Sequence, residues 1–357
     1  MNLKQRKQAL IDLGHFLERF FDNDPDDARE SQKFHAFNEL VKRAKQNNPW
    51  FTEEFLAKAL HAWKLALEER KVEQWLANYD FPNEPSLTIG IVSAGNIPLV
   101  GLHDIICGFI TGQHLLVKQS AKDQNLLPVF AQLLLKNDKQ QRIEFTSDRL
   151  EEFDAVIATG SNNTSRYFEY YFRSYPSVIR HNRNSVALLN GDESAEELNL
   201  LADDIMSYFG LGCRNVSKVY VAKDFDFDPL FKALLKYQHL INHHQYASNY
   251  EYNKAVYLMS SFQLLENGLV LLKEDKNLSS PIACLNYEYY EDLNDLEQKL
   301  NLQQDNIQCI VGDQAKISLA NVAFGETQQP ELWNYADNIN TLDFIDYTLK
   351  NTNYEKA

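Results

Sequence analysis

The stretch LTIGIVSAGNIP, residues 87–98, decides the fold of this chain. Its first half, Leu87–Val92, is a short run of apolar and β-branched residues, which is typical of a buried strand. Its second half, Ser93–Pro98, combines the glycine, asparagine and proline that favour a turn. We expect the apolar segment that follows, Leu99–Thr111, to be helical. A strand, a turn and a helix in this order begin an α/β fold.

The same order recurs further along the chain. Strands are predicted at His114–Lys118 and Ala155–Ala158, with a helix between them at Gln124–Lys136. Strands that alternate with helices at this spacing predict a parallel sheet with helices on both faces. Ligands bind such sheets at the carboxyl ends of the strands, so a cofactor is expected near the turns after Val92, Val117 and Ala158.

A second strand–helix region is predicted after residue 182. Its first helix, Ala195–Phe209, has Ser194 as its expected N-cap. The strands of this region are expected at Ser185–Leu189, Lys218–Ala222, 270–272, 282–285 and 307–311, with helix over 229–265. Upstream, residues 1 to about 78 are predicted to be helical, with Thr52 capping a helix over Glu54–Trp75 and a boundary at Pro82 and Pro85.

Composition limits the classes of function. The chain has 357 residues and a net charge of -15, which argues against nucleic acid and against an anionic membrane surface as partners. The longest apolar stretch, Leu99–Ile110, is interrupted by His103 and Asp104, so no membrane span is expected. The N-terminus is polar, and the four cysteines are far apart in sequence, as in a reduced intracellular protein. We therefore expect a soluble cytoplasmic protein.

Cys213 is the strongest candidate for chemistry. It lies in the sequence GLGCRN, residues 210–215, where two glycines bring bare backbone up to the thiol and an arginine follows. Nearby positive charge and backbone N–H groups favour the nucleophilic thiolate. The alternative, a buried structural cysteine after a helix, is equally compatible with this local pattern.

Three strand-end turns carry further candidates. Asn96 has a side-chain amide that can donate to a developing oxyanion, although asparagine also simply favours turns. Lys118 follows a strand, where it can reach a nucleotide or can be an ordinary exposed lysine. Thr159-Gly160-Ser161 precedes an aromatic helix, and small polar residues there can bind an anion or serve as an ordinary cap.

Two other groups of residues are candidates for binding. A basic cluster suits phosphate groups, or equally pairs with local acids; its members are Arg166, Arg173, Arg180, His181, Arg183, Arg214 and Lys218. The pair His243–His244 lacks a second pair of ligands at metal-binding spacing, so no metal is predicted.

Taken in order, these segments resemble the aldehyde dehydrogenase superfamily, and more closely its acyl-CoA reductase branch, typified by the LuxC fatty acyl reductase. The resemblance runs from about residue 85 to 345 and includes Phe324-Gly325-Glu326 and Leu332–Asp337 as a C-terminal signature. It implies two Rossmann-like α/β domains with parallel sheets, preceded by a helical segment. The implied division is an N-terminal helical segment (1–84), a cofactor domain (85–182), a catalytic domain (183–325) and a C-terminal segment that returns to the cofactor domain (326–357).

The resemblance also implies roles for individual residues. Cys213 takes the role of the nucleophile and Asn96 that of the oxyanion-stabilising amide. The implied contacts to a nicotinamide cofactor are made by Ser93, Ala94, Lys118, Ser120, Thr159, Gly160 and Ser161.

One departure from the family pattern is informative. Aldehyde-oxidising members carry a glutamate that activates water, whereas the corresponding stretch here, Ile179–Ser185, has no carboxylate. This favours NAD(P)H-dependent reduction of an acyl-CoA, with coenzyme A as the leaving group. Lys118 and Lys122 favour NADPH over NADH, and the family suggests a homo-oligomer. The alternatives are a hydrolytic aldehyde dehydrogenase that uses His181 or a distant glutamate, and a non-catalytic module that binds a nucleotide or coenzyme A.

Overall fold

A computed structural model of the chain describes residues 1–25, 28–138 and 140–355. The chain divides into two compact units. Unit 1 contains Met1–Asn182 and Gln329–Ala357, and unit 2 contains Arg183–Gln328. The chain therefore leaves unit 1 after residue 182 and returns to it at residue 329. The finer four-part division stays a prediction.

Unit 1 is built on a parallel sheet. Its strands in the described residues are Thr88–Val92 (β1), His114–Lys118 (β2), Ile143–Thr146 (β3), Ala155–Thr159 (β4) and Ser177–Arg180 (β5), and they lie in the order β3-β2-β1-β4-β5. The helices that connect these strands are Leu102–Ile110 (α5), Leu126–Leu134 (α6) and Asn162–Phe172 (α7). Ile89, Ile91 and Ile157 are fully buried in its core. This is the strand order of a Rossmann-type sheet, so the predicted parallel α/β architecture is confirmed.

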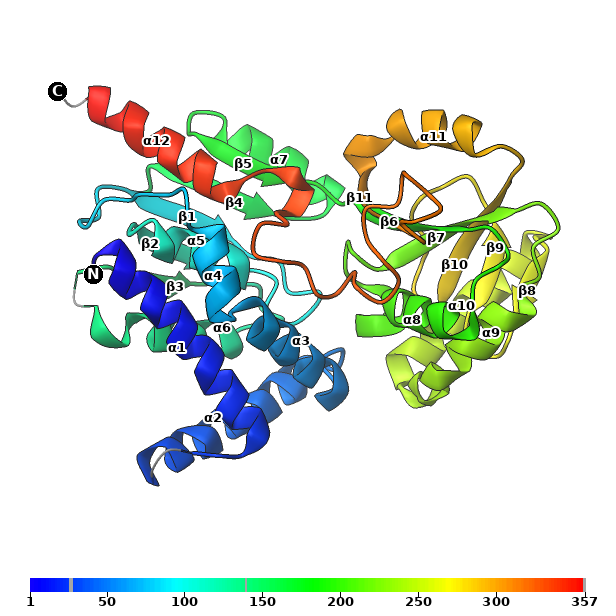
Figure 1. Cartoon of the computed structure of the whole chain (residues 1–357), viewed down its shortest axis with the longest axis horizontal. Coiled ribbons are helices and arrows are strands. Elements are labelled where there is room, and N and C mark those ends of the chain that lie inside the picture. The colour runs from blue at the N-terminus through cyan, green and yellow to red at the C-terminus, as the bar shows by residue number, and fades with distance from the viewer. Residues whose placement is uncertain (26–27, 139, 356–357) are drawn as a thin grey trace. The chain divides into compact units, whose positions relative to one another are not determined.

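Helices from both ends of the chain join unit 1, as Figure 1 shows from blue to red. The N-terminal helices are Leu3–Asp22 (α1), Ala28–Asn47 (α2), Glu53–Ala66 (α3) and Glu69–Trp75 (α4), and the C-terminal helix is Thr341–Glu355 (α12). Leu10 and Leu17 of α1 are fully buried in the same core as the sheet. Helix α1 contacts α5 and α6, and α12 contacts α5. Both ends of the chain therefore help to cover one sheet.

The predicted helix over Glu54–Trp75 is interrupted. Thr52 caps α3, as expected, by accepting a hydrogen bond from the Phe55 N–H at 3.2 Å. The helix then stops at Ala66, and α4 begins at Glu69. A Cβ on Gly14 of α1 would lie 2.7 Å from the Leu67 carbonyl oxygen, so α1 crosses in direct contact with the break. The sequence contains no glycine or proline at the break, and only this tertiary contact marks it.

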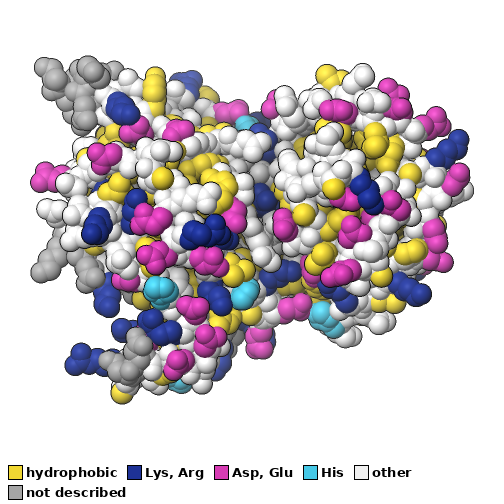
Figure 2. All heavy atoms as spheres, in the orientation of Figure 1, with side chains coloured by type: hydrophobic (Ala, Val, Ile, Leu, Met, Phe, Trp, Pro, Cys, Tyr) yellow, Lys and Arg dark blue, Asp and Glu magenta, His cyan; other side chains and the backbone are white. Residues whose placement is uncertain are grey.

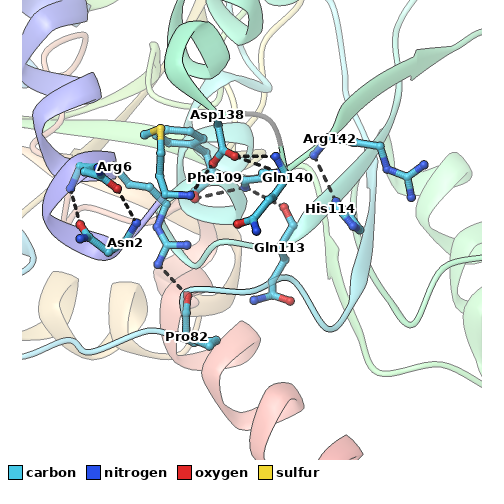
Figure 3. Close-up of polar contacts among 12 residues, drawn as sticks. Asn2, Arg6, Pro82, Phe109, Gln113, His114, Asp138, Gln140 and Arg142 are labelled. Carbon is cyan, nitrogen blue, oxygen red and sulfur yellow. Dashed lines mark hydrogen bonds and ion pairs between the residues drawn. The ribbon is translucent and has the colours of Figure 1, made fainter.

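A buried arginine ties α1 to the rest of unit 1 (Figure 3). Arg6 is 1% exposed, and its Nη2 donates to the Pro82 carbonyl oxygen at 2.9 Å. Gly112 lies against it with a φ of +80°, and a Cβ there would lie 1.8 Å from Arg6 Nη1. Burial lowers the pKa of Arg6 to about 10. The segment before the first strand is thus fixed by an arginine near the N-terminus.

Unit 2 contains a second sheet, mostly parallel. Its strands in the described residues are Asn184–Leu189 (β6), Val216–Ala222 (β7), Leu264–Glu266 (β8), Leu271–Glu274 (β9), Cys284–Tyr290 (β10) and Ile307–Val311 (β11), in the order β11-β6-β7-β10-β9-β8. Only the pairing of β8 with β9 is antiparallel among these strands. Its helices are Ala195–Met206 (α8), Asp228–Leu234 (α9), His244–Met259 (α10) and Leu293–Asn301 (α11).

Two expected helices of unit 2 differ from the structure. Helix α8 begins at Ala195 after the expected cap, Ser194, but it ends at Met206 rather than Phe209. The segment expected to be helical over 229–265 is α9, a 3₁₀ stretch and α10, and its last residues belong to strand β8. Acidic and basic side chains are interspersed over the face shown in Figure 2. None of the helices in the described residues has the length and apolar character needed to cross a bilayer.

Candidate functional site

The predicted cofactor loops of unit 1 lie at one edge of its sheet. Val92, at the end of β1, pairs with Lys118 on β2 and with Ala158 on β4. The three strands therefore end level with one another, and the loops that follow them are neighbours. The strand order reverses its direction between β1 and β4, and ligands of open α/β sheets bind at such a switch point.

The loop after β1 presents Asn96 from a closely packed backbone. The Ser93 N–H donates to the Lys118 carbonyl oxygen at 3.0 Å, and Ser93 is buried, whereas Asn96 is exposed. A Cβ on Gly95 would lie 2.6 Å from Ser120 Oγ, so only glycine fits here without movement. Ala94, which lies between Ser93 and Gly95, is partly exposed. The structure thus brings four of the predicted residues, Ser93, Ala94, Asn96 and Ser120, to one loop pair.

Lys118 lies at the same edge, but its amine is already engaged. Its Nζ donates to the carbonyl oxygens of Ser147 and Asp148, at 3.3 and 2.9 Å. These two residues follow β3. A contact between Lys118 and a cofactor stays a prediction, and it would require this lysine to share or exchange those acceptors.

The loop after β4 leads into the N-terminus of α7. Ser161 is the N-cap, and its Oγ accepts a hydrogen bond from the Thr164 N–H at 3.4 Å. A Cβ on Gly160 would lie 2.9 Å from the Phe168 ring, so the turn requires a glycine. With Thr159, these residues place backbone N–H groups of a helix start at the switch point. Such a start attracts anions.

The basic cluster does not act as one surface. Arg180 is 5% exposed and forms a bidentate pair with Asp104 of α5, at 2.6 and 2.7 Å. Lys218 of unit 2 is fully buried and donates to Glu288 at 2.6 Å. Arg173 lies over the Tyr170 ring, 4.9 Å from its centroid. The structural alternative, pairing with local acids, therefore holds for Arg180 and Lys218, and phosphate binding by these two was the wrong interpretation.

In unit 2, the backbone before Cys213 forms a left-handed turn. Tyr208, Phe209 and Gly210 have φ values of 52°, 58° and 74°. A residue other than glycine in this conformation costs roughly 1–2 kcal/mol, so two aromatic residues here store strain. The Phe209 ring packs against His243 and Tyr246, with centroid distances of 4.6 and 5.7 Å. This turn is what ends α8 earlier than the sequence indicated.

Asn215 holds the loop that contains Cys213. Its Oδ1 accepts a hydrogen bond from the Gly212 N–H at 2.9 Å. Its Nδ2 donates to the carbonyl oxygens of Asp204 and Ser207, at 3.1 and 2.8 Å, and so satisfies the C-terminal end of α8. Ser185 Oγ donates to the Cys213 carbonyl oxygen at 3.0 Å. The loop backbone is therefore fixed on both sides of the thiol.

A second network joins this loop to the segment Phe324–Thr327. Asp204 of α8 accepts hydrogen bonds from the N–H groups of Gly325 and Thr327, at 2.7 and 3.1 Å, and from Thr327 Oγ1 at 2.7 Å. Arg214, next to Cys213, donates through Nε to the Thr327 carbonyl oxygen at 2.5 Å. Burial raises the pKa of Asp204 to about 6, against the effect of these hydrogen bonds. The first half of the expected C-terminal signature thus supports the Cys213 loop within unit 2.

The four cysteines, all of which the structure describes, differ in exposure. Cys213 is exposed, and Cys107, Cys284 and Cys309 are buried. Burial raises the pKa of all three buried thiols, that of Cys284 to about 11. They are poor candidates for a thiolate nucleophile. The structural alternative of a buried Cys213 is excluded by its exposure.

Sequence reasoning missed the residues that hold these loops. Asn215 lies two residues after Cys213, and an asparagine there is a recognisable turn former. The spacing of Asp204 could also have indicated a buried role, because it lies three residues after Leu201 on the apolar face of α8. Asp123, which bonds the Asn96 loop, follows no pattern that the sequence reveals. His243, considered as a metal ligand, instead caps α10 by accepting from the Tyr246 N–H.

The fold defines the class of protein. The chain is similar to the crystal structure of aldehyde dehydrogenase 21 from Physcomitrella patens in complex with the reaction product succinate, with a TM-score of 0.66 and 12% identity over 98% of this chain and 84% of that one. It is also similar to the aldehyde dehydrogenase KauB from Pseudomonas aeruginosa (TM-score 0.62, 13% identity, 91% and 76% covered) and to the NAD+ complex of an aldehyde dehydrogenase from Bacillus cereus (TM-score 0.59, 13% identity, 87% and 72% covered). At these identities the likeness establishes the fold, which is that of the aldehyde dehydrogenases.

Within that fold, the family model of the acyl-CoA reductases (LuxC) matches residues 70–236. The matched segment includes Asn96, Lys118, Ser161 and Cys213. The resemblance to a LuxC-type acyl-CoA reductase with the aldehyde dehydrogenase fold is confirmed, and together the two findings support an aldehyde-handling oxidoreductase. None of the curated proteins compared with the chain matches it.

Proposed function

We propose that this protein is an NAD(P)H-dependent acyl-CoA reductase that forms an aldehyde from an acyl group carried on Cys213. The observation that carries the proposal is the Cys213 loop. It presents an exposed thiol on a strained backbone that Asn215, Ser185 and Arg214 hold in place. Strain of this kind persists where the surrounding structure over-determines it, and it is concentrated at functional sites.

The residues of unit 1 fit a nicotinamide nucleotide. The switch-point edge combines the capped N-terminus of α7 with a glycine, Gly160, that has no space for a side chain. The buried Nε2 of Gln119, directly after β2, has no hydrogen-bond partner among the described residues. Several proteins of similar fold were solved with NAD+. The residues that would hold the cofactor are Ser93, Ala94, Lys118, Ser120, Thr159, Gly160 and Ser161, and when bound it supplies the hydride that reduces the acyl group.

The chemistry of the chain then falls to two residues. The Cys213 thiolate attacks the carbonyl carbon of the acyl-CoA thioester, a C–S bond forms, and coenzyme A leaves as its thiolate and takes up a proton. In the proposed reaction the backbone N–H of Cys213 donates to the oxyanion that develops on the carbonyl oxygen, and Asn96 has the role of amide donor that the family resemblance assigns to it. After the acyl carbon is reduced, its bond to Cys213 breaks, the thiolate is restored and an aldehyde is released. No step consumes water, so no hydrolytic base is required.

The preference for NADPH gains support from Asp123. It is the carboxylate that follows Lys118 and Lys122 in the sequence, but it is buried and bonded to a backbone N–H. It is therefore not available to a ribose hydroxyl, and Lys122 is exposed. A panel of acyl-CoA substrates assayed with NADPH and with NADH measures both the chain length and the cofactor. Light scattering tests the expected homo-oligomer.

The decisive variant is Cys213→Ala. We expect it to lower acyl-CoA-dependent oxidation of NADPH at least about 10³-fold, because the acyl carrier is lost. The control variant Cys309→Ala removes a buried thiol of the same unit and should keep most of the activity. Mass spectrometry of the intact protein, incubated with acyl-CoA alone, should show one acyl group on the wild type and none on Cys213→Ala. Full activity of Cys213→Ala would exclude the proposed mechanism.

One observation favours a second candidate, hydrolytic aldehyde oxidation. His181 lies just after β5, and its Nε2 is 3.5 Å from the Glu169 carboxylate of α7. Both side chains are about half exposed, and a carboxylate–histidine pair is a common general base. Aldehyde oxidation that proceeds without coenzyme A, and that is lost in His181→Gln, would identify this activity. An inert Cys213 in thiol-labelling experiments would instead favour a non-catalytic module.

A further inference from the structure

The loop that presents Asn96 is held from one neighbouring segment, residues 118–123. The Ser93 N–H bonds to the Lys118 carbonyl oxygen, and Gly95 packs on Ser120. At the far end of the loop, the Leu99 N–H donates to Asp123 Oδ2 at 3.0 Å. The first two contacts involve backbone or close packing. In the third contact the acceptor is the carboxylate of a single side chain.

Leu99 is in an unfavourable conformation. Its φ is 63°, in the left-handed region that favours glycine, and its side chain is 2% exposed. A buried leucine gains nothing intrinsic from this backbone angle, so the surrounding contacts must hold it. Its N–H points to Asp123, and its carbonyl oxygen accepts the Leu102 N–H at 3.0 Å at the start of α5. The left-handed residue thus links the Asn96 loop to the helix that follows it.

Asp123 is unusual in its own right. It is 2% exposed, and its Oδ1 has no hydrogen-bond partner among the described residues. No ion pair in the part of the chain that the structure describes includes it, and the adjacent Lys122 is exposed. Burial raises the pKa of Asp123 to about 6, although the hydrogen bond from the Leu99 N–H opposes this shift. A carboxylate kept inside the protein with one oxygen unused is costly to the fold, which points to a role in the site.

We propose that Asp123 is a positioning residue that, through its hydrogen bond to the Leu99 N–H, fixes the left-handed turn and with it the direction of the Asn96 side chain. The proposal rests on the proposed function, in which Asn96 donates to the oxyanion. Asp123 itself touches no substrate.

The two protonation states of Asp123 have opposite effects on activity and on stability. The ionised carboxylate accepts the Leu99 N–H more strongly, because charge-assisted hydrogen bonds are stronger than neutral ones. Activity should therefore fall as the pH drops through about 6. The protonated form is the one that burial favours, so the same drop in pH should stabilise the fold. A residue with a purely structural role would not produce this opposition.

The test uses Asp123→Ala and Asp123→Asn, with Asp12→Asn as an exposed control on α1. At pH 7.5 we expect kcat of Asp123→Ala to fall about 10- to 100-fold with little change in KM for acyl-CoA, because the oxyanion donor is misdirected. Asp123→Asn keeps an oxygen acceptor for Leu99, so its loss should be smaller, and its pH profile should lack the acid limb near pH 6. The control should match the wild type in both respects.

Hydrogen exchange provides a readout that needs no activity. Backbone amides of residues 93–101 should exchange faster in Asp123→Ala than in the wild type or in Asp12→Asn, while peptides from β1 and β4 remain protected. Unchanged exchange in this loop, or a folded Asp123→Ala variant with kcat within twofold of the wild type, would overturn the proposal. A wild type without acyl-CoA reductase activity would reject the proposed function, and the exchange measurement would still decide whether Asp123 holds the loop.

Discussion

The two units hold their candidate loops in different ways. In unit 1, the end of the Asn96 loop is held by one side-chain hydrogen bond, from the Leu99 N–H to Asp123. In unit 2, Asn215 forms hydrogen bonds to both the Cys213 loop and the end of α8. Asp204 of α8 accepts hydrogen bonds from the segment Phe324–Thr327. Both aspartates are buried, and both have a pKa raised to about 6.

This difference has a physical consequence. The end of the Asn96 loop, where one side chain accepts the Leu99 N–H, should change direction when that bond is lost, while the sheet beneath it stays folded. A loop held by a network of buried groups leaves several of them unsatisfied when one member is removed, and each costs about 1–3 kcal/mol. Substitutions at Asp123 should therefore affect mainly catalysis. Those in the unit 2 network should affect stability as well.

The largest effect is expected at a buried ion pair of unit 1, away from its loop. Arg180→Ala leaves Asp104 as an uncompensated charge beside α5 and also removes the bond to Thr341 Oγ1. We expect unfolding in urea to require about 3–5 kcal/mol less. The double variant Arg180→Met/Asp104→Leu should recover most of this loss. In unit 2, Glu288 pairs with both Lys218 and Lys299, so Lys299→Ala should cost far less because Glu288 keeps its bond to Lys218. Equal losses in the two units would contradict this contrast.

The next effect concerns the network of unit 2. Asn215→Ala removes the partner of the Gly212 N–H and leaves buried carbonyl groups of α8 without their donor. We expect a loss of about 2–4 kcal/mol in the free energy of unfolding, together with a faster reaction of Cys213 with a thiol reagent as the loop loosens. Asn215→Asp keeps the acceptor for Gly212 and should fall between the wild type and the alanine variant. A fully stable Asn215→Ala would show that the network contributes little.

A smaller effect is expected from close packing at the Asn96 loop. Gly95→Ala places a Cβ 2.6 Å from Ser120 Oγ, which the β1 loop can relieve only by moving. The expected cost in stability is about 1–3 kcal/mol, with a drop in kcat because Asn96 moves too. Combining it with Ser120→Gly opens the space and should restore part of both losses. A double variant no better than Gly95→Ala would place the constraint elsewhere.

The smallest effect is the pH dependence of Asp204. Its folded-state pKa of about 6 lies above its usual value of 3.8, so the folded protein binds more protons than the unfolded chain between these values. The stability that protonation contributes is fully present below about pH 3.8 and is lost as the pH rises through about 6. Relative to Asp204→Asn, the wild type should gain about 1 kcal/mol in urea unfolding between pH 7.5 and 5.5. An identical pH dependence of the two proteins would show that Asp204 does not titrate in this range.

Much of the fold could be predicted from the sequence, because short apolar runs bounded by turn residues are typical of buried strands. Leu87–Val92, His114–Lys118 and Ala155–Ala158 all became strands of unit 1. Strands β3 and β5 were not predicted, because Ile143–Thr146 and Ser177–Arg180 are only four residues long and partly exposed. The break between α3 and α4 was missed because the residue that packs against it, Gly14, is distant in sequence.

Some residues of the candidate site could also be predicted from the sequence, and others could not. Cys213, Asn96 and the turn Thr159–Ser161 were predicted from the sequence because each lies next to a glycine in a turn, and because their order resembles that of a known family. Phosphate binding was the wrong interpretation for Arg180 and Lys218. The sequence does not reveal that each of them pairs with a carboxylate inside its own unit. Asp123 and Asp204 act on backbone groups 24 and more than 100 positions away, so no local pattern identifies them.

By itself, the sequence determined the alternation of strands and helices, the turns at the strand ends and the thiol among glycines. These features depend on local preferences and on the periodicity of apolar residues. The tertiary structure alone decided that the three turns of unit 1 meet at one edge, that Cys213 is exposed, and that buried aspartates hold Leu99 and Thr327. These features depend on strand register and on burial, which bring together residues that the chain keeps far apart.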